Sequence, residues 1–362
     1  MDSMTSRDRI VAALEGQPVD HPPFCPFLAY VWQSWPKEIQ DPGQLEFHRW
    51  AGADPLWRGA VGTVVVDAKD TTTQTREADG QVFTETVCPV GRLRSVAVRS
   101  AEGNTCFLVE HPLKTEEDYK VQIWIEEHTE SRYTPVYADE FLAQDGREGL
   151  ALGMLIPRCK SAFQSLIEHH VGTEKLTYDL CDFPDTVTAL WRAMADNDLK
   201  AVRLAADSPY DYFITWEDSS TQNYSPAQYE QFIGAEIRQW CAILRQHGKR
   251  YVQHACGHVR DLAARMKADG VHAIESVASP PTGNIALRDL RAVAGSKFGI
   301  VGGIEPTELL RRSPEKLVPY VEQVLADGAG GPFVLANADS CPPGVPPGKF
   351  KLIAQVARGF PP

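Results

Sequence analysis

The strongest constraint on the fold is a regular alternation of short apolar runs and helical segments over the last third of the chain. Strands that alternate with helices form parallel sheets joined by right-handed crossovers. No Gly-X-Gly-X-X-Gly motif opens any of these helices, so the pattern favours a (β/α)8 TIM barrel over a dinucleotide-binding sheet. The expected strands are residues 251–253, 273–275, 298–301 and 333–336, and the expected helices are residues 259–268, 286–294 and 349–358, with two more that begin at Pro306 and Pro314.

The first third of the chain does not show this alternation of strands and helices. Residues 22–28, PPFCPFL, are apolar and bounded by prolines, so we expect them to open the first barrel strand. Between residues 60 and 110, three β-branched runs are separated by Asp79-Gly80 and Gly103-Asn104, which are hairpin signals. We therefore expect one α/β domain over residues 1–362, a TIM barrel with an N-terminal β-rich insertion at about residues 60–110 that serves as a lid or wall.

Composition excludes several classes of protein. The net charge of −12 argues against non-specific binding to nucleic acid, which needs clustered Lys and Arg. No run approaches the length of a membrane span, and the polar, charged start does not look like a signal peptide. The eight cysteines show no paired spacing, so reduced thiols and a cytoplasmic location are expected.

One strand of the predicted barrel delivers two metal-binding side chains. His254 and Cys256 are two residues apart, and such residues point to the same side of a strand. Cys341 follows a second apolar run, residues 333–336, and could supply another thiolate from a neighbouring strand. Two thiolates and an imidazole suit zinc, and three protein ligands with one open position is the catalytic arrangement. The alternative is that the cysteines are buried packing residues.

Carboxylates follow several of the predicted strands. Glu217 is the first candidate for a displaceable metal ligand and a catalytic group, although it could instead cap a helix, and the neighbouring Asp218 has the same two interpretations. Glu275 is a second catalytic candidate that could orient His254, or a solvated carboxylate at the barrel rim. Other residues that could face the pocket, or could serve only structure, are Trp216, His258, Glu305 and Asp339.

Four stretches carry a family likeness. They are residues 4–16 (MTSRDRIVAALEG), Ser225-Pro226, residues 302–306 (GGIEP) and residues 341–346 (CPPGVP). On these stretches the chain resembles the uroporphyrinogen decarboxylase superfamily along nearly its whole length. More narrowly, it is similar to the branch of zinc- and cobalamin-dependent methyltransferases, which includes coenzyme M methyltransferases and the methyltransferases of O- and N-demethylating systems.

The resemblance implies a site and a set of partners. In that branch the zinc motif is His-X-Cys followed far downstream by Cys, and His254, Cys256 and Cys341 match it. The likeness implies Zn²⁺, a corrinoid (cobalamin) as co-substrate carried by a partner corrinoid protein, and a small thiol, folate, methoxy or methylamine compound as the other substrate. It is compatible with a homodimer.

Two other functions stay open at this stage. The first is a cofactor-free decarboxylase like uroporphyrinogen decarboxylase itself. Enzymes of that kind carry arginines on their early strand to pair with the carboxylates of the substrate, whereas residues 21–30 of this chain contain no Arg. The second is a non-catalytic barrel in which zinc with four protein ligands is structural.

Overall fold

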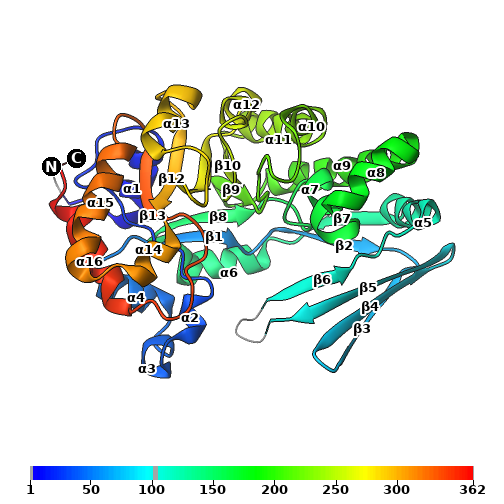
Figure 1. Cartoon of the computed structure of the whole chain (residues 1–362), viewed down its shortest axis with the longest axis horizontal. Helices are drawn as coiled ribbons and strands as arrows, with labels where there is room; N and C mark the ends of the chain where they lie inside the picture. Colours follow the sequence, from blue (N-terminus) through cyan, green and yellow to red (C-terminus); the bar gives the residue numbers. More distant parts are fainter. Residues whose placement is uncertain (1–2, 101–104, 362) are drawn as a thin grey trace.

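The core of the molecule is a curled parallel sheet of seven strands (Figure 1). The structure, a computed structural model, describes residues 3–100 and 105–361. In spatial order the strands are β1 (Leu56–Ala60), β8 (Leu150–Met154), β9 (Tyr212–Thr215), β10 (Arg250–His254), β11 (Ala273–Val277), β12 (Gly299–Ile304) and β13 (Phe333–Asn337). Each neighbouring pair is parallel, as the alternation of strands and helices predicts.

Residues 23–25 take the eighth position and close the barrel. Phe24 forms a parallel bridge with Leu335 of β13, and the amide of Cys25 donates to the carbonyl of Leu335 at 2.8 Å. On the other side, the amide of Asp54 donates to the carbonyl of Phe24 at 2.8 Å. The strand expected over residues 22–28 is therefore only a bridge, because the prolines of this stretch have no N–H to donate to a neighbouring strand.

Helices surround this sheet. Those at Pro306 and Pro314 begin where the sequence predicts, whereas the helix expected over residues 259–268 begins only at Ala263. Ser225 caps α10 by accepting a hydrogen bond from the amide of Gln228, and Pro226 is the first helical residue. Two segments, η2 and η3, have π-helical geometry. In chain order the helices after α1 are α2 (Val31–Ser34), α3 (Lys37–Gln40), α4 (Gln44–Ala51), α5 (Glu116–Glu127), α6 (Val136–Gln144), η1 (Gly146–Glu148), α7 (Ala162–Ser165), η2 (Leu166–His170), α8 (Thr173–Asp182), α9 (Pro184–Ala205), α10 (Pro226–Gln228), η3 (Tyr229–Ile233), α11 (Gly234–Gln246), α12 (Ala263–Asp269), α13 (Leu287–Ala294), α14 (Pro306–Arg311), α15 (Pro314–Gly328) and α16 (Pro347–Gly359).

The lower part of the barrel interior is a closed apolar plug. Helix α1 (Ser6–Leu14) packs Ile10 and Leu14 against strand residues such as Leu56 and Val252. Side chains alternate between the two faces of a strand, so the residues two positions further along each strand also point inward. The next interior layer toward the carboxyl ends is polar, and it contains Arg58, His254 and Glu275.

The β-rich insertion is present as an antiparallel sheet. Strands β3 (Thr72–Ala78), β4 (Gln81–Cys88), β5 (Gly91–Arg99) and β6 (Cys106–Glu110) pair in that order, and Figure 1 shows them at the lower right, apart from the barrel strands. Strand β2 (Val64–Ala68) pairs instead with β7 (Thr129–Tyr133). The hydroxyl of Thr105 lies 3.2 Å from that of Tyr30, so the start of β6 contacts the barrel. None of the helices in the described parts of the chain combines the length and apolar content that a membrane span requires.

Candidate metal centre

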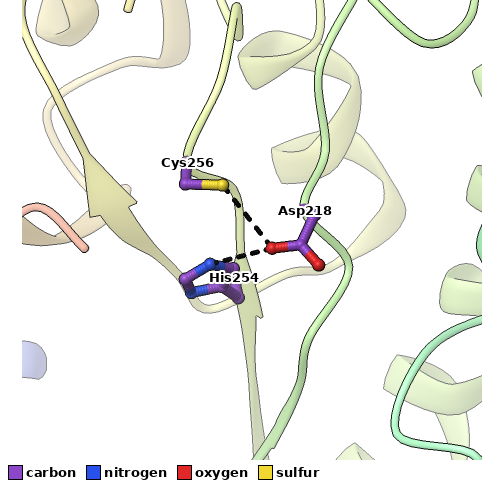
Figure 2. A group of neighbouring side chains, drawn as sticks. All are labelled: Asp218, His254 and Cys256. Carbon is purple, nitrogen blue, oxygen red and sulfur yellow. Dashed lines mark hydrogen bonds and ion pairs between the residues drawn. The ribbon is translucent and has the colours of Figure 1, made fainter. Parts of the chain in front are cut away.

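Three side chains from two neighbouring strands meet at the carboxyl end of the barrel. His254 is the last residue of β10, Cys256 follows it, and Asp218 comes shortly after β9. Their ligand atoms all lie within 4.8 Å of one another (Figure 2). One carboxylate oxygen of Asp218 is 3.2 Å from His254 Nε2 and 3.5 Å from Cys256 Sγ. The structure thus brings His254 and Cys256 together, and the carboxylate that joins them is that of Asp218.

Glu217 and Asp218 point to different places. The backbone of Asp218 has φ +45°, a conformation that is uncommon for non-glycine residues and that turns the chain between Glu217 and Asp218. Its other carboxylate oxygen is held by Lys160 Nζ at 3.1 Å. The Glu217 carboxylate is fully buried, and it accepts hydrogen bonds from the amide and hydroxyl of Ser161, both at 2.7 Å, and from Thr215 at 2.8 Å. The structure therefore does not bring Glu217 into the cluster.

Glu275 stands behind His254. One of its carboxylate oxygens lies 2.6 Å from His254 Nδ1, and the other accepts a hydrogen bond from Arg58 Nε at 2.6 Å. The side chains of Arg58 and Glu275 are 1 % and 0 % exposed, so this ion pair is cut off from water. A carboxylate on one nitrogen of a histidine fixes the ring and leaves the other nitrogen for a metal.

The local charges keep the two carboxylates, Glu275 and Asp218, in the ionised form. Burial works to raise the pKa of Glu275, but the Arg58 guanidinium and His254 outweigh it and hold that pKa below its usual value. Burial also works to raise the pKa of Asp218, which His254 and Lys160 nevertheless lower. Burial raises the pKa of the Cys256 thiol. A bound cation would reverse that last effect, because a coordinated thiol is deprotonated.

Cys341 lies outside the cluster of three. It is buried among apolar side chains, burial raises its pKa to about 12, and its backbone bridges to Tyr30. In the loop that carries Cys341, the charge of Asp339 contributes to raising the pKa of Cys256, after the larger effect of burial.

The remaining candidates have identifiable contacts. Trp216 packs edge-on against the His254 ring, with 5.2 Å between ring centroids, and stacks on Phe27. Glu305 caps α14 by accepting from the amide of Thr307. The amide of His258 donates to the hydroxyl of Ser220 at 3.0 Å. Trp216 thus lines the site, whereas these contacts of Glu305 and His258 are structural.

Sequence reasoning missed two residues of this site, Arg58 and Lys160. Arg58 lies in β1, LWRGA, where an arginine and a glycine interrupt the apolar run, and Lys160 lies in a loop. The one sequence signal for the role of Arg58 was the presence of a charged residue inside a strand of the barrel.

The donor set fits a zinc ion. An imidazole nitrogen, a thiolate and a carboxylate oxygen are three of the ligand types that zinc takes in proteins. All three belong to side chains that are at least partly buried, and their atoms are already close together. The arrangement can therefore hold a Lewis acid at the barrel mouth, beside an aromatic wall.

The comparisons with known proteins define a family and a fold. The model of the uroporphyrinogen decarboxylase (URO-D) family matches residues 161–360, more than half of the chain, so the protein belongs to that family. Its structure is similar to a methyltransferase from Methanosarcina mazei, with TM-score 0.64 and 14% sequence identity over 99% of each chain. A weaker likeness, with TM-score 0.46 and 9% identity over 94% of this chain and 97% of the other, is to a B12-independent methionine synthase from Shewanella sp. W3-18-1. No curated protein matches the chain.

Proposed function

We propose that the protein is a zinc-dependent methyltransferase, which moves a methyl group between a corrinoid and a small thiol, folate, methoxy or methylamine compound. The observation that carries the proposal is the convergence of His254, Cys256 and Asp218 at the carboxyl end of a barrel. Catalytic sites of (β/α)8 enzymes lie at that end. The fold shared with a methyltransferase supports the proposal, and the corrinoid is expected on a partner protein.

His254 and Cys256 are the central zinc ligands in this proposal. Cys341, predicted from the resemblance, completes the set of three protein ligands, and Asp218 replaces Glu217 as the displaceable carboxylate. Asp218 suits that role because Lys160 holds its second oxygen, so the carboxylate can leave the metal and remain paired. A displaceable ligand opens the fourth position, which a substrate heteroatom can then occupy.

The chemistry follows from the donor set. Zinc, when bound, acts as a Lewis acid that lowers the pKa of a thiol or polarises the heteroatom of a methyl donor. Glu275 orients His254, and Trp216 and Phe27 give the site a flat apolar side. The corrinoid carries the methyl group, while the protein supplies orientation and exclusion of water.

The second candidate, decarboxylation of a carboxylated tetrapyrrole, is favoured by the family match alone. A substrate with many carboxylates needs free guanidinium groups. Arg58 is already bound to Glu275, and Arg158 is bound to Glu126 and Asp198. Carbon dioxide release from a porphyrinogen by metal-free protein would support this alternative.

The cytoplasmic location expected from the sequence stays a prediction.

The experiment that tests the proposal measures zinc and methyl transfer in the same protein preparations. We expect about one zinc per chain in the wild type and demethylation of methylcobalamin with a thiol acceptor, followed by the change in corrinoid absorbance. Cys256→Ser loses both, and Cys181→Ser, a change of an exposed cysteine, keeps both. A wild-type protein that binds no zinc under reducing conditions, or that binds zinc and transfers no methyl group to or from any of the four substrate classes, contradicts the proposal.

A further inference from the structure

One ion pair crosses the barrel from wall to wall. Arg58 belongs to β1 and Glu275 to β11, which are the first and fifth strands in the spatial order. With residues 23–25 in the eighth position, these two strands lie opposite each other. The Arg58 Nε to Glu275 Oε1 distance is 2.6 Å, and neither side chain reaches solvent.

Arg58 is fixed on more than one side. Its Nη2 donates to the carbonyl of Cys25 at 3.0 Å, and its guanidinium lies over the ring of Phe27, 5.1 Å from the centroid. Both partners come from the segment that closes the barrel. The guanidinium therefore has little freedom to follow Glu275 if that carboxylate moves.

The backbone is distorted directly after each partner of the pair. The pairing register shifts between Arg58 and Ala60 on β1, where Gly59 has φ +66°, and again after Glu275 on β11, where Ser276 has φ +72°. Bulges of this kind re-aim the neighbouring side chains and are common next to functional sites. A β carbon at Gly59 would lie 2.7 Å from the Trp216 ring, so the bulge on β1 also makes room for the wall of the site.

The β11 bulge explains the glycine pair of the next strand. A β carbon on Gly302, whose φ is +144°, would lie 2.8 Å from the amide nitrogen of Val277. Only glycine lets β12 approach the distorted part of β11 this closely. The structure thus accommodates the distortion that places Glu275 between Arg58 and His254.

We infer that Arg58 is a positioning residue for the metal centre, acting through Glu275 on His254. This inference rests on the proposed metal function. Arg58 anchors Oε1 of Glu275, so that Oε2 is left to accept the Nδ1 proton of His254. Nε2, the nitrogen that faces Asp218 and the cluster, is then the one that a metal would bind. Without Arg58, nothing described in the structure holds the Oε1 side of the carboxylate, and the ring loses its fixed tautomer and direction.

The test measures zinc affinity by competition with a chromophoric chelator in wild type, Arg58→Met and Arg58→Lys. Arg58→Met should bind zinc about 10–100-fold more weakly, the usual cost of losing a group behind a metal ligand. Arg58→Lys should recover part of that loss, because its ammonium can pair with Glu275 but cannot also reach Cys25. The absorption spectrum of the cobalt(II)-substituted protein should change in Arg58→Met, because it reports ligand geometry and not enzyme turnover.

Arg9→Met is the matched control. Arg9 is also a buried arginine held by carboxylates, Asp20 and Asp54, but it lies at the other end of the barrel. We expect the zinc affinity and cobalt spectrum of Arg9→Met to equal those of the wild type. If Arg58→Met does not fold, Arg58→Lys, which keeps a cation beside Glu275, serves in its place, with a smaller weakening expected.

The outcomes separate the inference from the proposed function. Equal zinc affinity and equal cobalt spectra in wild type and the Arg58 variants overturn the positioning role, while methyl transfer by the wild type would still stand. Weaker zinc binding in Arg58→Met without any methyl transfer by zinc-loaded wild type supports the positioning role and overturns the function. A wild type that binds neither metal overturns both.

Discussion

The two ends of the barrel each hold a buried arginine, and they differ in what the carboxylate partners of that arginine contact. At the amino end, Arg9 binds Asp20 at 2.6 Å and Asp54 at 2.5 Å, and Asp54 also accepts from the amide of Phe24. At the carboxyl end, Arg58 binds Glu275, which continues to His254. The first network ends in the backbone and at the imidazole of His21, whose Nδ1 lies 3.3 Å from Asp20. The second ends at the imidazole of His254, whose other nitrogen lies 3.2 Å from Asp218 in the cluster of possible metal ligands.

The two ends show that a buried ion pair can serve stability alone or can also hold a functional side chain in place. Arg9, Asp20 and Asp54 have ordinary negative φ angles, in keeping with a purely structural network. At the other end, Asp218 and Ser276 have φ of +45° and +72°, conformations that cost free energy and persist where the surroundings impose them. The difference predicts that the amino end governs stability and the carboxyl end governs metal binding.

The largest effect is expected from Arg9→Met. Removing one partner of a buried charge network leaves carboxylates unpaired and should lower the free energy of unfolding by about 3–5 kcal/mol. Urea unfolding measures this loss, and zinc content per folded chain should be unchanged. A stable Arg9→Met protein that has lost its zinc would reverse the assignment of the two ends.

A pH titration of stability separates the ends in a second way. Burial raises the pKa of Glu217 to about 7, so its stabilising contribution is complete below about pH 4.5 and is lost as pH rises through 7. Relative to Glu217→Gln, the wild type should lose up to about 3 kcal/mol over that window. At the amino end the hydrogen bond from Arg9 lowers the pKa of Asp20, so its contribution is lost instead as pH falls below the unfolded value of 3.8. A constant difference between wild type and Glu217→Gln from pH 4 to 8 would contradict the first part.

Cys341→Ser tests the thiolate predicted from the resemblance. We expect zinc affinity to fall by about 100-fold or more, beyond the range for residues behind the ligands. Chelator competition gives the affinity, and Cys181→Ser is the control for the loss of a thiol. Unchanged affinity would leave Asp218, His254 and Cys256, the cluster already assembled, as the whole set of protein ligands.

The smallest effect is expected from Asp218→Asn. A displaceable ligand contributes less to zinc affinity than a permanent one, so the affinity should fall by only about tenfold. The substrate no longer has to displace a carboxylate from the zinc, so the Michaelis constant for the thiol should also fall. Zinc binding and the Michaelis constant for the thiol, measured together, check both parts. A loss as large as that of Cys256→Ser would show that Asp218 is a permanent ligand.

Much of the fold was predictable because its signal is periodic. The strands from β9 to β13 and the helices between them follow from apolar spacing and from prolines at helix starts. The pairing of His254 with Cys256 follows from the two-residue repeat of a strand. Strand β1 was missed because Arg58 and Gly59 interrupt its apolar pattern.

The details of the site depended on backbone conformations that local sequence does not reveal. Hydrophobic periodicity does not show whether Glu217 or Asp218 faces the site. The φ of +45° at Asp218 turns the chain within one residue, so the two carboxylates point to different places. Residues 302–306 contribute to the family likeness, but only the structure shows that Gly302 makes room for the bulge of β11. Long-range partners such as Arg58 and Glu275, which are 217 residues apart, appear only once the barrel closes.

The ion pair across the barrel also separates the candidate metal centre from the apolar interior. Arg58 and Glu275 lie in the layer next to the apolar plug formed with Leu56, Val252 and α1. Because the pair is buried, a molecule bound at the metal centre could extend below it only by separating two charges. We therefore expect differences in substrate size to arise from the loops after the strands and not from the inward-facing residues of the barrel strands.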